Sequence, residues 1–412
     1  MKYIRTYGVY NSWKLDYSNP DRGFRLKPTL YRYPHTGYED AILLKLDDPR
    51  KHGDSTYIKI HIDSDIEFSF YIGNKPGDTQ TTMTCTIDWD DGVVETKTIT
   101  KDNYGFKLSH NYTGRNVREI ELYNVERDYS IVGDATNFKS LISHPSTVKN
   151  VILGNNVVST GDEAFSECSS ITSVYIPNSV NSIGYDTFCN CTSLTSVNIP
   201  EGATIGDCAF NSCTSLTSVH IPESVVSIGE SMFYGCTGLT SVHIPESVVS
   251  IGESMFYGCT SLTSVYIPEG VTTIEDGVFK NCTSLTSVYI PEGVTTIGST
   301  TYEGVFENCS SLTSIYIPRS VTSIGRNAFK DCSSLTSIDI PEGVTTIDDG
   351  TFNNCTSLSS ISIHSTTVPT INGFAFNYLP DSGILHIKPG ATGYDDLLGG
   401  HFPPNWRIVE DL

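Results

Sequence analysis

The chain has 412 residues, which is more than one ordinary globular core holds, and its composition is that of a folded protein. A formal net charge of −21 weighs against nucleic acid as a partner, because a phosphate backbone requires a basic face. No run approaches the roughly 18 apolar residues of a membrane helix, so we expect no membrane insertion.

Residues 1–55 are predicted to be a basic, tyrosine-rich segment. They hold ten Lys and Arg against seven Asp and Glu, so the acidity of the chain lies further on. A basic start on an acidic body is typical of a docking arm, and an ordinary edge of the first domain explains it equally well. The first residues contain no apolar stretch of the kind found in a secretory signal.

Residues 56–126 are predicted to form a β-sandwich. The runs TYIKIHIDSDIEFSFYIG and VREIELYNV are strand-like, and the motifs IDWDDG and SHNYTG lie between them. This combination resembles the PKD-like, immunoglobulin-like sandwich domains, and the resemblance implies a spacer or an adhesion module. Residues 127–144 are predicted to be a linker.

Asp88, Asp90 and Asp91 stand close together in the first of these motifs. Carboxylates at such a spacing either form a turn or bind calcium, and we expect turn formers.

From about residue 145 the chain repeats. Cysteines recur at intervals of 22, 23 or 27 residues, a period typical of leucine-rich repeats. With each cysteine as offset 0, apolar residues recur at offsets 3, 6, 8, 12, 15 and 20. A strand is predicted at offsets 4–8, ended by the proline at offset 9. In the 27-residue unit the extra residues fall near Ser299–Tyr302, where a loop absorbs them.

Each unit is too short to bury its own apolar face, so neighbouring units must stack and share one core. We therefore predict a mainly β protein in which the sandwich precedes a leucine-rich-repeat solenoid of about ten coils over 145–365, with a parallel sheet on the concave face. Residues 366–412 are predicted to be a capping element, in which Trp406 and Ile408 close the core.

The cysteines of the repeat are predicted to be reduced core residues, because each takes the same place in its coil and a thiol packs as a small apolar group. A functional or cross-linked role is the alternative. Cys85, Cys189 and Cys208 lie outside the register. The nine cysteines of the register are Cys168, Cys191, Cys213, Cys236, Cys259, Cys282, Cys309, Cys332 and Cys355.

Coils of the form SLTSVYIPEGVTTIG resemble the BspA-like leucine-rich repeats of surface proteins, and the end of the chain resembles the closing element that follows such repeats. The resemblance implies an extracellular, cell-surface protein that adheres to a host protein, another cell or a glycan. Because no export signal is present in this chain, a phage virion component for structure or host attachment is the alternative location.

On such a solenoid the outward strand positions form the binding surface, and offset 7 carries large, chemically varied side chains there. Tyrosine suits protein or glycan ligands because it combines contact area with a hydroxyl group. Cross-strand stacking that only stabilises the sheet is an equal alternative. The predicted ligand-binding residues are Tyr175, Asn198, His220, His243, Tyr266, Tyr289, Tyr316 and Asp339.

We predict that the chain is not an enzyme and uses no cofactor, because it contains none of the common catalytic motifs. His220 and His243 are adjacent in the predicted ladder, but two histidines without a third ligand make a poor metal site, so no metal is predicted. A rigid spacer without a specific ligand is the second functional hypothesis, and the oligomeric state is left open.

Overall fold

The computed structural model describes residues 13–15, 26–28, 58–64, 67–74, 78–103, 105–112, 116–123, 129–131, 133–134, 139–140, 142, 145–155, 157–300 and 303–412. The chain forms two compact units, Met1–Asp54 and Ser55–Leu412. In the first unit, β1 (Trp13–Leu15) pairs antiparallel with β2 (Leu26–Pro28). The remainder of the predicted docking arm, residues 1–55, lies outside the described residues.

The second unit begins with antiparallel strands in two sheets. One sheet contains β3, β8, β5 and β6 in that order, and in the other β4 lies beside β7. Phe68 and Phe70 of one sheet and Met83 and Ile87 of the other belong to the same buried cluster. The predicted antiparallel sheets are therefore present, while the closer likeness to PKD-like domains stays a prediction. The strands are β3 (Ile58–Ser64), β4 (Glu67–Asn74), β5 (Thr82–Asp88), β6 (Val94–Thr100), β7 (Phe106–Asn111) and β8 (Asn116–Tyr123).

The aspartates of the IDWDDG motif act on the turn that follows β5. Asp88 Oδ1 accepts a hydrogen bond from the backbone N–H of Asp90 at 2.9 Å, and Asp91 Oδ1 accepts one from Val93 at 3.2 Å. The second Asp91 oxygen lies 2.7 Å from Nε2 of His110, which belongs to the SHNYTG motif. The two motifs therefore meet in space, and Asp88 and Asp91 shape the turn.

Both N-terminal sheets continue into the solenoid without a break. Strand β12 (Val148–Leu153) pairs antiparallel with β3 on one side and parallel with the first coil on the other. In the second sheet, β9 (Tyr129–Ile131) pairs antiparallel with β4 and parallel with β13 (Val157–Thr160). The predicted linker 127–144 thus contains a strand that joins the two parts, and also β10 (Gly133–Asp134) and β11 (Lys139–Ser140). These strands are only two or three residues long, so the sequence shows no alternation of polar and apolar residues that would have predicted them.

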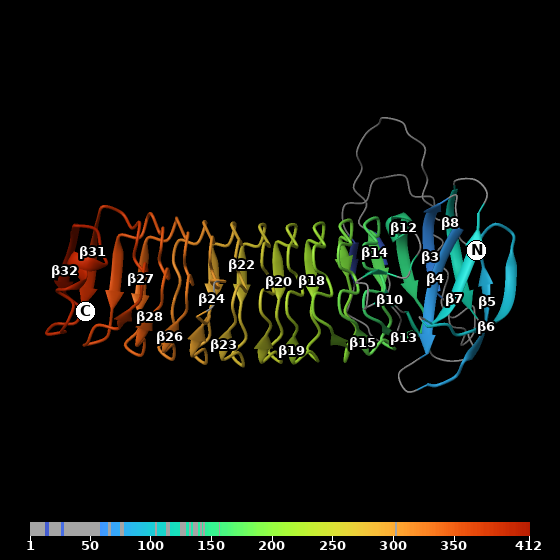
Figure 1. The fold of residues 1–412 in the computed structure, drawn as a ribbon, viewed down its shortest axis with the longest axis horizontal. Coiled ribbons are helices and arrows are strands. Elements are labelled where there is room, and N and C mark those ends of the chain that lie inside the picture. The colour runs from blue at the N-terminus through green and yellow to red at the C-terminus, as the bar shows by residue number, and fades with distance from the viewer. Residues whose placement is uncertain are drawn as a thin grey trace, which may run out of the picture. The chain divides into compact units, whose positions relative to one another are not determined.

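Most coils of the solenoid contribute a first strand at the predicted offsets, and these strands lie side by side along the second unit (Figure 1). In the coil that begins at Cys309, the same offsets are described but form no strand. Parallel register is maintained between neighbours, for example Val265 with Val288. The first strands are β14 (Ser173–Tyr175), β16 (Ser196–Val197), β18 (Ser218–His220), β20 (Ser241–His243), β22 (Ser264–Tyr266), β24 (Ser287–Tyr289), β27 (Ser337–Ile340) and β29 (Ser360–Ile363).

A second file of strands, at offsets 14 and 15, was not predicted. Each strand is a Ser-Ile or Thr-Ile pair whose isoleucine is buried in most coils, so the sequence shows only another apolar position. After β13 the file contains β15 (Ser182–Ile183), β17 (Thr204–Ile205), β19 (Ser227–Ile228), β21 (Ser250–Ile251), β23 (Thr273–Ile274), β25 (Thr296–Ile297), β26 (Ser323–Ile324), β28 (Thr346–Ile347) and β30 (Thr370–Ile371).

Phenylalanines at offset 20 form a continuous stack through the core. Phe256, for example, is fully buried and lies 5.9 Å from Phe233 and 5.6 Å from Phe279 between ring centroids, with the rings within about 10° of parallel. The stack passes the 27-residue unit unchanged, since Phe279 and Phe306 are 5.3 Å apart. The insertion near Ser299–Tyr302, of which residues 301 and 302 are outside the described part, therefore leaves the core intact.

The repeat cysteines are buried, and they do more than fill space. The thiol of Cys259 donates a hydrogen bond to the carbonyl oxygen of Phe233 in the preceding coil at 3.2 Å, and the same contact recurs from Cys191 to Cys355. The residue before the cysteine adopts a left-handed conformation, with φ of 62° at Asn281, which explains why Asn is frequent there. Burial raises the pKa of the Cys282 thiol to about 12.

We expect thiol reagents to distinguish two classes of cysteine. Ten of the twelve are buried, and only Cys189 and Cys208 are partly exposed. In the native protein these two thiols should react, slowly because burial raises the pKa of each, and the other ten should react only after denaturation. Titration of free thiols with and without denaturant tests this, and fast labelling of more than two in the native state would contradict it.

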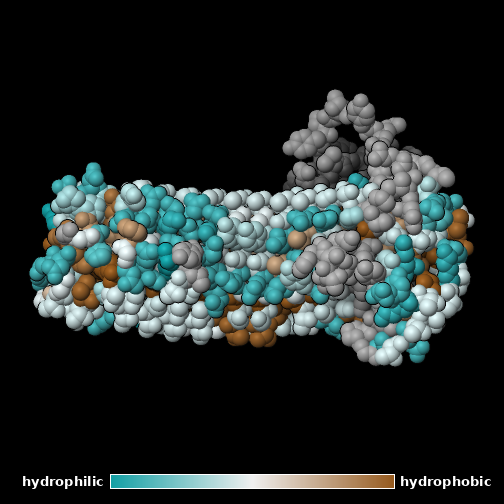
Figure 2. Space-filling view, in the orientation of Figure 1, coloured by the Kyte–Doolittle hydropathy of each residue, from teal (hydrophilic) through white to brown (hydrophobic). Residues whose placement is uncertain are grey.

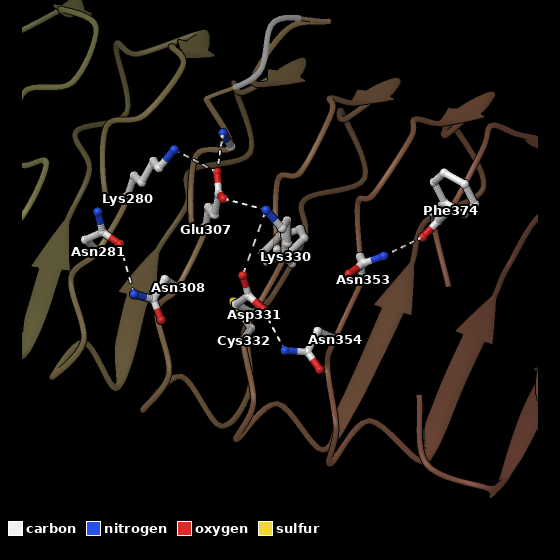
Figure 3. Close-up of polar contacts among 12 residues, drawn as sticks. Lys280, Asn281, Glu307, Asn308, Lys330, Asp331, Cys332, Asn353, Asn354 and Phe374 are labelled. Carbon is white, nitrogen blue, oxygen red and sulfur yellow. Dashed lines mark hydrogen bonds and ion pairs between the residues drawn. The ribbon is translucent and has the colours of Figure 1, made fainter. Parts of the chain in front are cut away.

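Beside the Phe stack, polar side chains on the turns also pair from coil to coil (Figure 3). Lys280 contacts Glu303 at 2.6 Å and Glu307 at 3.0 Å, and Lys330 reaches the other oxygen of Glu307 at 2.9 Å. Asn308 donates to Asn281 at 2.9 Å. These contacts hold the turns on either side of the 27-residue unit in register.

The C-terminal segment covers the last coil. Strands β31 (Ser382–Ile387) and β32 (Asn405–Glu410) extend the first-strand sheet in parallel, with α1 (Leu397–Gly400) between them. Phe402 stacks on Phe376 at 4.6 Å, and the Trp406 indole donates to the carbonyl of Pro380 at 2.8 Å. Trp406 is buried, as a cap requires. Within the described residues, no helix has the length and apolarity needed to cross a bilayer.

Candidate functional site

The eight predicted ligand-binding residues occupy offset 7 of successive coils, at or beside the end of the first strand where that strand is present, and together they are called here the first-strand row. His220 pairs with His243 and Tyr266 with Tyr289, so neighbours lie directly beside one another. The tyrosines of the row are 41 to 55% exposed. The row consists of Tyr175, Asn198, His220, His243, Tyr266, Tyr289, Tyr316 and Asp339.

Asn198 differs from the rest of the row because its side-chain amide forms hydrogen bonds with the backbone of the preceding coil. Its Nδ2 donates to the carbonyl of Ile176 at 2.8 Å, and its Oδ1 accepts from the Ile176 N–H at 3.3 Å. The amide thereby replaces strand-to-strand hydrogen bonds at the end of β16. Asn198 holds two coils together and has little left to offer a ligand.

The tyrosines of the row pair with glutamates that sequence reasoning missed. The hydroxyl of Tyr289 donates to Glu269 at 2.8 Å, and that of Tyr316 donates to Glu292 at 2.6 Å. Each glutamate stands at offset 10 of the preceding coil, after the proline. Glutamate recurs at this offset in most coils, but the recurrence suggested a turn residue, and only the stacking of coils brings it beside offset 7.

These hydrogen bonds keep the phenols protonated. The bond to Glu269 raises the pKa of Tyr289 to about 12, and the bond to Glu292 raises the pKa of Tyr316. Each hydroxyl proton is donated to a carboxylate, so both groups can only accept further hydrogen bonds. The pairs therefore form an anionic surface of hydrogen-bond acceptors.

Two of the tyrosine rings in the row stack on one another. Tyr266 and Tyr289 have centroids 4.9 Å apart and an angle of 4° between ring planes. Each ring therefore covers one face of the other. The flat contact area that we expected from tyrosine is reduced by one face in each ring of this pair.

The histidines of the row show no arrangement for a metal. Among the described residues, no three His, Cys, Asp or Glu side chains are grouped so as to hold a metal ion. His243 instead lies 3.7 Å from Glu223, which is the same offset-7 to offset-10 contact that the tyrosines make.

Comparisons with known proteins assign the repeats. The family model described as the BspA type leucine rich repeat region (6 copies) matches residues 141–204, 203–305 and 300–390, which is more than half of the chain. The chain belongs to the BspA-type leucine-rich repeat family. The comparison with curated proteins gave no match.

The chain is also similar to solved structures of leucine-rich repeat proteins. A leucine-rich repeat protein of T. pallidum is 32% identical, and the match covers 45% of this chain and 83% of that one, with a TM-score of 0.40. A leucine-rich cell surface protein from Faecalibacterium prausnitzii A2-165 is 31% identical over 54% of this chain and 75% of that one, with a TM-score of 0.36. A leucine-rich repeat protein from Bacteroides ovatus is 22% identical over 81% and 100%, with a TM-score of 0.44.

Much of the surface of the BspA-type solenoid seen in Figure 2 is hydrophilic or neutral. A hydrophobic patch lies near β19, where Val226 and Val249, the residues just before β19 and β21, are 55% and 52% exposed. Two valines make a small patch, so the polar first-strand row remains the more extensive chemical feature.

Proposed function

We propose that this BspA-type protein is a non-catalytic recognition protein displayed at a cell surface, and that its first-strand row binds a protein or glycan partner. One observation carries the proposal: an exposed row of tyrosine and histidine repeats in register from coil to coil, each of several members paired with a glutamate. The description of the F. prausnitzii relative as a cell surface protein supports the location. The N-terminal sheets and solenoid then act as the support that holds the row.

A rigid spacer is the competing function. The unbroken Phe stack and the two files of parallel strands give the second unit the regularity that a spacer needs. A spacer has no use for exposed tyrosine pairs beyond their small contribution to sheet stability. The two functions therefore differ in what happens when the pairs are removed.

Replacing Tyr266 and Tyr289 together by alanine is expected to reduce adhesion to partner cells or matrix by about tenfold or more, since the removal of interface tyrosines commonly costs 1 to 2 kcal/mol each. Adhesion of the purified chain to immobilised cells, matrix protein and glycan panels measures the effect.

The chain offers a matched control. Tyr234 and Tyr257 form a stacked pair with centroids 4.5 Å apart, located on the turns away from the first strands. Their double alanine variant loses the same atoms and one ring stack, so adhesion should be retained. Equal adhesion by both folded variants would favour the spacer.

A further inference from the structure

We propose that the row residues from His243 to Tyr316, together with the offset-10 glutamates from Glu223 to Glu292 beside them, bind a lysine- or arginine-rich segment of a partner protein. This inference rests on the proposed recognition role of the row and names the class of partner.

The charge in this part of the chain is strongly one-sided. Residues 150–318 contain sixteen Asp and Glu and a single Lys or Arg, which is Lys280. Lys280 forms ion pairs with Glu303 and Glu307 on the turns; the contact with Glu307 is seen in Figure 3. Among the described residues, no lysine or arginine forms an ion pair with the glutamates from Glu223 to Glu292, although Arg319 stands at the same offset one coil beyond Glu292.

Those carboxylates form a regular line. Glu223, Glu246, Glu269 and Glu292 stand at offset 10 of four consecutive coils, and all are exposed. With coils about 4.8 Å apart, the line is roughly 14 Å long, which about five residues of an extended peptide span. A basic segment of that length can place several cationic groups along it.

The hydrogen-bonding capacity of the line favours a donor-rich partner. The Tyr289 and Tyr316 hydroxyl protons are donated to Glu269 and Glu292, so these groups can only accept further hydrogen bonds. Lysine and arginine are donors without acceptors, so they complement this surface. Their apolar stems can lie along the exposed ring edges while the charged groups reach the carboxylates.

A neutral glycan fits less well. Sugar rings gain most from an aromatic face, and Tyr266 and Tyr289 each cover one face of the other. Sugar hydroxyls are neutral, so they also make no use of the charge.

The chemistry of the line changes at its C-terminal end. In the coil after Glu292, Arg319 takes the glutamate position, and Asp339 takes the tyrosine position in the next coil. The following carboxylate, Glu342, is paired with Lys388 at 2.9 Å. At the other end, Glu201 accepts a hydrogen bond from Ser224 at 2.8 Å. Among the described glutamates at offset 10, those that pair with neither a lysine nor a serine are thus the four from Glu223 to Glu292.

Binding of a short labelled peptide in which lysines alternate with serines tests the inference. The variant E246Q/E269Q/E292Q removes three charges from the row while its amide oxygens still accept from the tyrosines. The variant E230Q/E253Q/E275Q removes three exposed carboxylates that follow the second strands, so the two proteins have equal net charge. We expect the first to weaken peptide binding roughly tenfold at low salt and the second by about twofold or less.

Equal losses in the two variants would mean that the peptide responds only to overall charge, and the inference would be wrong. It would also be wrong if the peptide does not bind while partner adhesion remains sensitive to the loss of Tyr266 and Tyr289; in that case the recognition role survives and the partner is not basic. Binding of a neutral glycan that is lost in E246Q/E269Q/E292Q would likewise replace the basic segment as the ligand class.

Discussion

Replacing Phe256 with alanine is expected to lower the free energy of unfolding by about 3 to 5 kcal/mol. The ring is fully buried and stacked on Phe233 and Phe279, so its removal leaves a cavity and breaks two ring contacts. Because a coil contacts only its neighbours, the damage should concentrate in the coils beside the cavity. Denaturant unfolding gives the total, and hydrogen exchange locates the loss.

The same coil contains a control for this prediction. Val249 is 52% exposed, so Val249→Ala removes apolar atoms without opening the core, and it should change stability by no more than about 0.5 kcal/mol. A Phe256→Ala protein as stable as the Val249→Ala protein would show that the stack contributes little. The Phe stack would then not be a main source of the stability of the solenoid.

Removing residues 391–412 is expected to cause self-association and fraying of the last coils. The truncation deletes β32, Phe402 and Trp406, and thereby exposes the edge of β31 and the buried side chains of Phe376 and Leu385. An open sheet edge beside an apolar end is a site for pairing with another chain. Light scattering after size-exclusion chromatography measures association, and exchange of the β29 and β31 amides measures fraying.

A point variant separates the two roles of the cap. Trp406→Ala keeps β32 but loses the indole that packs on Phe402 and bonds to Pro380. We expect it to be destabilised by about 3 to 5 kcal/mol yet to remain monomeric if the wild type is monomeric. A truncated protein that stays as stable and as dispersed as the full chain would show that the segment is not a cap.

The repeat core is predictable because each coil must bury the same positions. Leu262, Val265 and Phe279 are buried as their offsets indicate, and the first strands end before the offset-9 proline. The outward placement of Tyr266 and Tyr289 follows from the same alternation. The periodicity of the sequence therefore predicts where a residue lies within its own coil.

Contacts between coils are less accessible to sequence reasoning. The Tyr289–Glu269 pair joins residues of different coils. It forms only because neighbouring coils stack in a particular register, which the sequence of one coil does not show. The thiol of Cys259 finds the Phe233 carbonyl for the same reason. The junction with the N-terminal sheets was missed because β9 is only three residues long, and its pairing partners β4 and β13 lie far along the chain on either side.

The equivalence of the coils has a genetic consequence. The run HIPESVVSIGESMFYGCT occurs twice, at 220–237 and 243–260, and each copy meets the same kind of surface in the coil before and the coil after. Recombination between such copies adds or deletes a whole coil while leaving both ends of the solenoid unchanged. The length of the solenoid can therefore change between generations in steps of about 4.8 Å, the spacing of one coil. No new interface between coils has to evolve.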